Sequence, residues 1–142
     1  MTQQQASQPT SARYGTIVGG IAAIVAGLLT ALLGTMLHGQ ILYVGDTPVT
    51  WGAVAALVLA TAFFTLAATY SERLWAAALA GTLAYGVVAL ISFDSVNWLI
   101  VPWSNREHMF GPALAGSLWT FGLVAATIVA LFLSAAALRR RR

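Results

Sequence analysis

Long apolar segments are the dominant pattern along this chain of 142 residues. Four of them, at about 15–37, 51–70, 74–93 and 112–138, contain no charged residue. Each is close to the length of about 20 residues that a helix needs to cross roughly 30 Å of hydrocarbon. None alternates apolar and polar positions as a half-buried strand does, and an open sheet edge would leave backbone groups unpaired in lipid. The pattern therefore predicts an all-α polytopic membrane protein with four transmembrane helices.

Polar and basic residues separate these spans and divide the chain into three parts. Residues 1–13 are rich in Gln, Ser and Thr and carry no apolar pattern, so we expect a disordered cytoplasmic tail. A signal peptide is the alternative, but the apolar run that follows is longer than a secretory h-region of roughly 7–15 residues. Residues 14–138 form the expected four-helix domain, and residues 139–142 form a basic end. The second and third spans are separated only by residues 71–73, which predicts an antiparallel helical hairpin.

The arginines predict the orientation of the chain in the membrane. With an even number of spans, Arg13, Arg73 and the C-terminal arginines fall on one side, and Arg106 falls on the other. The positive-inside rule then places both termini in the cytoplasm. The basic end is also expected to hold anionic phospholipid, cardiolipin included, in the inner leaflet. The residues with this expected role are Arg139, Arg140, Arg141 and Arg142.

Composition argues against a soluble protein. Hydrophobic residues make up 59% of the chain and charged residues 8%, with a mean hydropathy of +0.82, so polar surface is too scarce to cover a water-soluble core. The net charge is +3, but the arginines lie beside apolar segments and there is no lysine, so we expect no nucleic-acid binding. The absence of cysteine excludes disulfides and thiolate metal sites.

Candidate chemistry is sparse within the spans. Every acidic residue lies in a loop or at a span end. This disfavours proton-coupled transport, which relies on an ionisable group inside the membrane. His38 and His108 lie near span ends on the predicted outer side and could hold zinc or haem b if they met, but no His-x-x-x-His spacing supports such a site. We therefore expect no enzyme activity, no catalytic residue, no metal and no cofactor.

The second outer loop, residues 94–111, is the most unusual polar segment. Its middle is too apolar to extend into water and too short to cross the membrane. It is expected either to lie in the headgroup region as an aromatic anchor or to form a docking surface for a partner subunit. The residues that we expect at a partner contact are Trp98, Trp103, Arg106 and His108.

Small residues predict where helices pack closely. Gly20, Gly27 and Gly34 recur every seven residues and leave one face of the first span nearly bare, which makes this stripe a candidate contact with a partner complex or with a sibling helix. Gly81 is the residue of the third span that we expect at a close helix contact. Bare faces permit close helix contact, which in lipid gains dispersion energy. Trp119 lies about two turns inside the fourth span, where its indole N–H needs a partner or a place in a helix interface.

Several short motifs are spread over residues 15–138. They are Gly27–Leu28–Leu29 with Gly34 and His38, Pro48 with Trp51–Gly52, Ser71–Glu72–Arg73–Leu74, and Gly116 to Trp119 with Gly122. Together they resemble a family of small four-helix membrane proteins of actinobacteria. That family is similar to the accessory subunits of the actinobacterial supercomplex of cytochrome bc and cytochrome oxidase. The resemblance implies a supporting subunit in a bacterial cytoplasmic membrane, without a redox centre of its own. The second outer loop departs from the resemblance, because it is longer here than in that family.

These observations favour a non-catalytic accessory subunit that supports the assembly or stability of a larger membrane complex, with the respiratory supercomplex as the expected complex. The expected partners are other integral membrane subunits and phospholipid. The alternative is a small-molecule membrane protein, either a transporter or a binder of lipid, quinone or haem, lined by Tyr85, Trp119 and the threonines of the spans.

Overall fold

The structure is a computed structural model that describes residues 8–93 and 99–141, with side chains described from Arg13 onward. Within this part of the chain the elements are α1 (Gln8–His38), β1 (Leu42–Val44), β2 (Thr47–Val49), α2 (Trp51–Ser71), α3 (Leu74–Ser92), the 3-10 helix η1 (Trp103–Asn105) and α4 (Phe110–Arg139). The four described α-helices are each long and apolar enough to cross a membrane, which confirms the predicted helical class.

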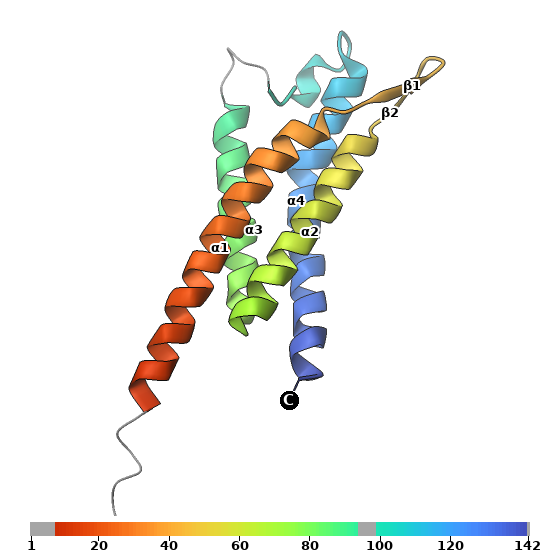
Figure 1. Cartoon of the computed structure of the whole chain (residues 1–142). Coiled ribbons are helices and arrows are strands. Elements are labelled where there is room, and N and C mark those ends of the chain that lie inside the picture. Colours follow the sequence, from red (N-terminus) through yellow and green to blue (C-terminus); the bar gives the residue numbers. More distant parts are fainter. Residues whose placement is uncertain (1–7, 94–98, 142) are drawn as a thin grey trace, which may run out of the picture.

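The four helices lie side by side and give the molecule two distinct ends (Figure 1). One end carries the β1–β2 hairpin and η1, and is called the loop end below. The other carries the connection between α2 and α3 and the C-terminal end of α4, and is called the turn end.

Helices α1 and α4 extend further than the predicted spans. Helix α1 begins at Gln8, inside the segment 1–13 for which the sequence predicts a tail, and α4 runs from Phe110 to Arg139. The difference arises because an apolar run marks only the part of a helix inside lipid, while helical hydrogen bonds continue into the interface. Pro112 fits in the first turn of α4, where the missing N–H costs no intrahelical hydrogen bond.

A tight turn joins α2 to α3. Glu72, which follows the last residue of α2, adopts a left-handed conformation with φ 55°. The backbone N–H of Arg73 then donates to the carbonyl of Ala68 at 3.0 Å. A left-handed residue of this kind satisfies a terminal carbonyl and reverses the chain. The two helices run antiparallel, as the short connection predicts.

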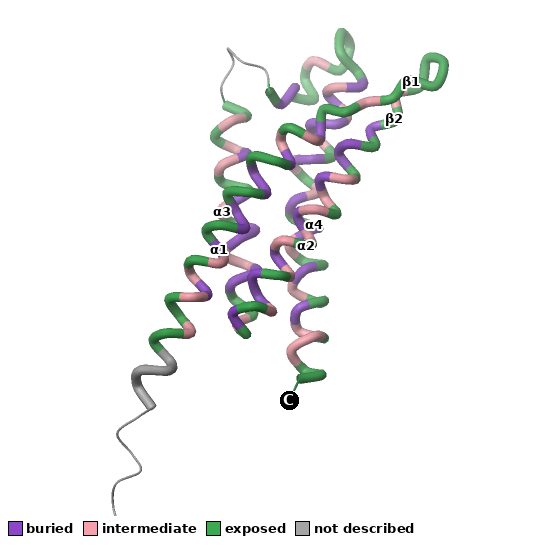
Figure 2. The backbone as a smooth tube through the Cα atoms, in the orientation of Figure 1, coloured by how far each residue is buried: buried purple, intermediate pink, exposed green. Residues whose placement is uncertain are grey.

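The core consists mainly of small side chains. Helices α1 and α4 each pack against both α2 and α3 but share few contacts with each other. Most buried apolar residues are alanine, and the largest fully buried apolar side chains are Trp119, Phe64, Leu123 and Val88. Figure 2 shows the buried positions on the faces that the helices turn toward one another. Small residues inside allow close approach of the helices, while most of the larger apolar side chains are exposed on the outside of the bundle, as suits a lipid solvent.

The first loop folds into a short hairpin that the apolar pattern does not predict. Leu42 pairs with Val49, and Val44 pairs with Thr47, in antiparallel register. Gly45 has φ +61° and takes the first central position of the two-residue turn, where a positive φ favours glycine. Strands of three residues are too short to produce a recognisable alternation.

Candidate functional site

A buried cluster at the loop end joins the first helix to the last. The Trp119 side chain of α4 is fully buried. Its indole N–H donates to the Thr35 hydroxyl of α1 at 3.4 Å, at the long end of the range for a hydrogen bond. Its ring also stacks on His38, with 6.2 Å between ring centroids and 22° between the planes. The predicted need of Trp119 for a hydrogen-bond partner is therefore met within the chain.

Gly34 makes this contact sterically feasible. A Cβ at Gly34 would overlap the Cη2 and Cζ2 atoms of the Trp119 ring. The indole thus occupies the space that a side chain at position 34 would fill. Because the ring is rigid and enclosed, it has little freedom to move aside.

His38 also belongs to this cluster. It is buried at the end of α1, with Nδ1 at 2.6 Å from the carbonyl oxygen of Thr35. Because a carbonyl only accepts, Nδ1 carries the hydrogen in this contact. His108, in contrast, is exposed. Among residues 8–93 and 99–141, no group of three or more His, Cys, Asp or Glu could hold a metal ion.

The other glycines singled out in the sequence have different surroundings. A Cβ at Gly27 would lie 2.8 Å from the carbonyl oxygen of Ala80 in α3, and a Cβ at Gly81 would overlap Thr127 of α4. Gly20 has no heavy atom within 4 Å of its Cβ position. Gly27 and Gly34 therefore pack against helices of the same chain. Gly20 is the position of the stripe that no other helix of the chain covers.

Sequence reasoning missed a further close approach beside Gly20. Gly19 is buried, and a Cβ there would lie 2.9 Å from Cζ2 of Trp75 in α3. The heptad spacing selects Gly20 because it keeps a period of seven, but it carries no information about which neighbouring helix lies opposite. No pattern in the sequence pairs Gly19 with Trp75, so the sequence holds no signal that could have identified Gly19.

An exposed aromatic and cationic cluster lies in the second loop. The guanidinium of Arg106 sits over the Trp103 ring, 5.6 Å from its centroid. Trp103 also packs against Phe110 with tilted rings, 6.1 Å between centroids and 58° between planes. Trp103 is 43% exposed and Phe110 is 51% exposed. We call these three residues the Trp103 cluster.

The apolar middle of this loop folds back onto the bundle. Ile100 and Val101 are buried, and the carbonyl oxygen of Val101 would lie 2.7 Å from a Cβ at Gly116 in α4. The sequence prediction has this segment in the headgroup region or against a partner, whereas these two residues pack against their own helices. The difference arises because Gly116 opens a space beside α4 that the loop backbone can enter. Trp98, the other predicted contact, lies outside the described residues.

The basic end of α4 is accessible. Arg139, Arg140 and Arg141 are exposed at the turn end, and Arg142 lies outside the described residues. Arg139 ends the helix, where a cation complements the helix dipole.

Comparisons with protein-family models, with curated proteins and with solved structures found no match. The resemblance to the actinobacterial family and the role that it implies therefore stay predictions.

Proposed function

We propose that this chain is a non-catalytic accessory subunit that supports the assembly or stability of a larger membrane complex. The candidate complex is the respiratory supercomplex of cytochrome bc and cytochrome oxidase in a bacterial cytoplasmic membrane. In this proposal both termini are cytoplasmic, so the loop end faces outward and the basic end of α4 contacts anionic phospholipid.

The observation that carries this proposal is the Trp103 cluster. Tryptophan and arginine are enriched among the residues that dominate binding energy at interfaces. The cluster is half-exposed, while the adjoining Ile100 and Val101 are buried and fix the loop to the bundle. A surface held in this way loses little conformational entropy when a partner binds. The loop end therefore presents a preorganised aromatic surface beside a cation.

The helix contact with a partner needs a different surface from the one that the glycine stripe suggests. Gly27 and Gly34 already pack against α3 and α4. Phe121 and Phe132, in contrast, project from α4 with 73% exposure each. In the proposal, this outward face of α4 and the open position at Gly20 meet lipid or a neighbouring subunit.

Affinity purification of loop variants tests the proposal. The tagged chain is purified from native membranes after gentle solubilisation, as wild type and as Trp103→Ala, Arg106→Ala and Leu42→Ala. Leu42 lies in β1 at the same end and is also exposed, so it serves as the matched control. We expect the two cluster variants to recover less of the partner subunits, and Leu42→Ala to recover the wild-type amount. Recovery of the wild-type chain without any stoichiometric partner would contradict the proposal.

The groove between α2 and α4 is the observation that favours the alternative, a small-molecule membrane protein. Its volume is about 750 Å³, and Thr61, Thr65 and Thr69 line one side. The Thr65 hydroxyl is buried without a hydrogen-bond partner among the described residues. Trp119, which the sequence prediction includes in such a lining, lies instead in the α1–α4 contact. A Soret band, or quinone at unit stoichiometry in extracts of the purified chain, would favour this alternative.

A further inference from the structure

A second groove, between α1 and α2, combines an apolar trough with a cation at one end. We propose that it binds one acyl chain of an anionic phospholipid, whose phosphate is held by Arg73. This site is separate from the arginines at the C-terminal end of α4, and it does not depend on the accessory role proposed above.

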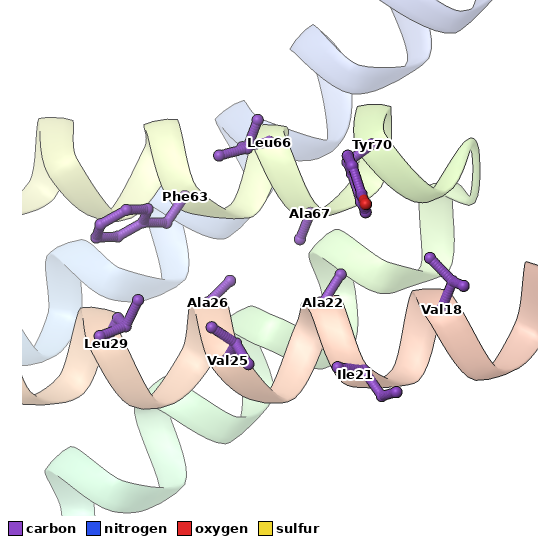
Figure 3. A pocket seen from close by; sticks show the side chains of 10 residues that line it. All are labelled: Val18, Ile21, Ala22, Val25, Ala26, Leu29, Phe63, Leu66, Ala67 and Tyr70. Atoms are coloured by element: carbon purple, nitrogen blue, oxygen red, sulfur yellow. The ribbon is translucent and has the colours of Figure 1, made fainter.

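Small residues create the trough. Ala22 and Ala26 of α1 face Ala67 of α2, and larger apolar side chains form its walls (Figure 3). The groove has a volume of about 440 Å³, within the range of small-molecule sites. At the loop end the same two helices are in close contact, since a Cβ at Gly52 of α2 would overlap the carbonyl oxygen of Leu37. The groove therefore lies toward the turn end.

The length of the groove matches one leaflet. Along α1 it extends from Val18 to Leu29. At 1.5 Å per residue this is about 16 Å, or roughly half of a hydrocarbon core about 30 Å thick. An acyl chain entering from the turn end would fill this length and stop near the midplane. A transmembrane helix of a partner would need a surface that continues across both leaflets.

Polar groups gather where the groove ends. Val18 and Tyr70 lie at the same end of the groove in Figure 3. Beyond them, the half-buried Arg73 extends across to α1, with Nη2 at 3.1 Å from the position that a Cβ at Gly15 would take. Gly15 is one turn before Val18, so the guanidinium lies just past the apolar trough. Tyr14, exposed on α1, precedes Val18 by four residues and so shares its face of the helix.

The charge of Arg73 selects the class of lipid. Among the described residues, no ion pair or hydrogen bond engages its guanidinium group. A guanidinium presents planar donors that match phosphate oxygens, and tyrosine is favoured at the membrane interface. Glu72, the preceding residue, is exposed and takes the left-handed position of the turn. A phosphate at the mouth of the groove would therefore supply hydrogen-bond acceptors for this guanidinium.

Lipid titrations of the purified full chain test this site. Native mass spectrometry measures the binding of phosphatidylglycerol and of phosphatidylcholine to wild type, Arg73→Gln and Ala22→Leu. Arg13→Gln is the control for loss of an exposed cation at the same end, because Arg13 precedes Val18 by five residues and so lies on another face of α1. Ala125→Leu is the control for added bulk, because Ala125 lines the other groove. Thermal unfolding of each variant checks that the fold is intact.

We expect Arg73→Gln to weaken phosphatidylglycerol binding by about ten-fold, the effect of losing a hydrogen bond to a charged group. Ala22→Leu should weaken the binding of both lipids because the leucine fills the trough, and both controls should bind as wild type does. Wild-type phosphatidylglycerol binding by Arg73→Gln and Ala22→Leu would overturn the proposal. An equal loss in Arg13→Gln would also overturn it, since the attraction would then be a general effect of positive charge at this end. The accessory role would be unaffected by either result.

Discussion

The indole ring of Trp119 occupies the space beside Gly34 where any larger residue would place its side chain. This single relationship links α1 to α4, two helices that share few other contacts. It also positions the Thr35 hydroxyl to accept the indole N–H. The contact between α1 and α4 therefore depends on the absence of a side chain at position 34.

Gly34→Ala should destabilise the bundle by about 1–3 kcal/mol, the usual cost of overpacking a core. Gly20→Ala is the matched control, because its Cβ meets open space on the same helix. Replacing glycine by alanine favours the helix by about 1 kcal/mol at either position. The difference in stability between the two variants therefore reports the clash with Trp119. Thermal unfolding in lipid nanodiscs measures the stability of each variant. Equal unfolding temperatures for the two variants would show that Trp119 does not fill this space.

A second pair of glycines tests the contact between α3 and α4. Gly81→Ala should lower the unfolding temperature, because its Cβ would overlap Thr127. Gly86→Ala, on the same helix, places its Cβ in open space and should leave that temperature unchanged or raise it. The unfolding temperatures of the two variants are compared in the same nanodiscs. A Gly81→Ala variant as stable as Gly86→Ala would contradict the packing described for this interface.

The hydrogen bond between Trp119 and Thr35 should contribute little to the free energy of unfolding. We expect a double-mutant cycle of Trp119→Phe and Thr35→Val to give a coupling free energy of about 0.6 kcal/mol, the average for such bonds in membrane proteins. The long distance of 3.4 Å favours a value at or below this average. A coupling well above about 1.7 kcal/mol would mean that the hydrogen bond, more than the fit to Gly34, joins the two helices.

The sequence predicts the helices well because span length is a property of local composition. It predicts helix contacts less well, since the stripe of Gly20, Gly27 and Gly34 meets different surroundings along its length. Gly27 faces α3, Gly34 faces α4, and Gly20 faces open space. A tilted helix meets successive neighbours, so equal spacing along the sequence does not imply one shared partner.

The candidate site is only partly predictable for a similar reason. The sequence predicts Trp103 and Arg106 at a partner contact because they lie in the unusual second loop, and both are exposed in the structure. Ile100 and Val101 have the same apolar character as residues that anchor in a membrane, yet they are buried beside Gly116. Their placement depends on a gap in α4, and composition within the loop carries no signal of it.

Cysteine labelling tests the orientation that the arginines predict. The chain has no cysteine, so Ser104→Cys at the loop end and Glu72→Cys at the turn end each introduce a single thiol. With the turn end cytoplasmic, a membrane-impermeant maleimide should label Ser104→Cys, but not Glu72→Cys, in intact cells. Both should react after lysis, which controls for access. Labelling of Glu72→Cys alone in intact cells would contradict the prediction, because the turn end would then face outward.

The central claim is that this chain works as a subunit of a larger membrane complex. Blue-native electrophoresis of gently solubilised native membranes, followed by immunodetection of the chain, tests it most directly. We predict that the chain migrates in a high-mass band together with integral membrane subunits, and that Trp103→Ala moves part of it to lower mass. Migration of the wild-type chain only at the position of the free 14.9 kDa protein in its detergent micelle would contradict the claim.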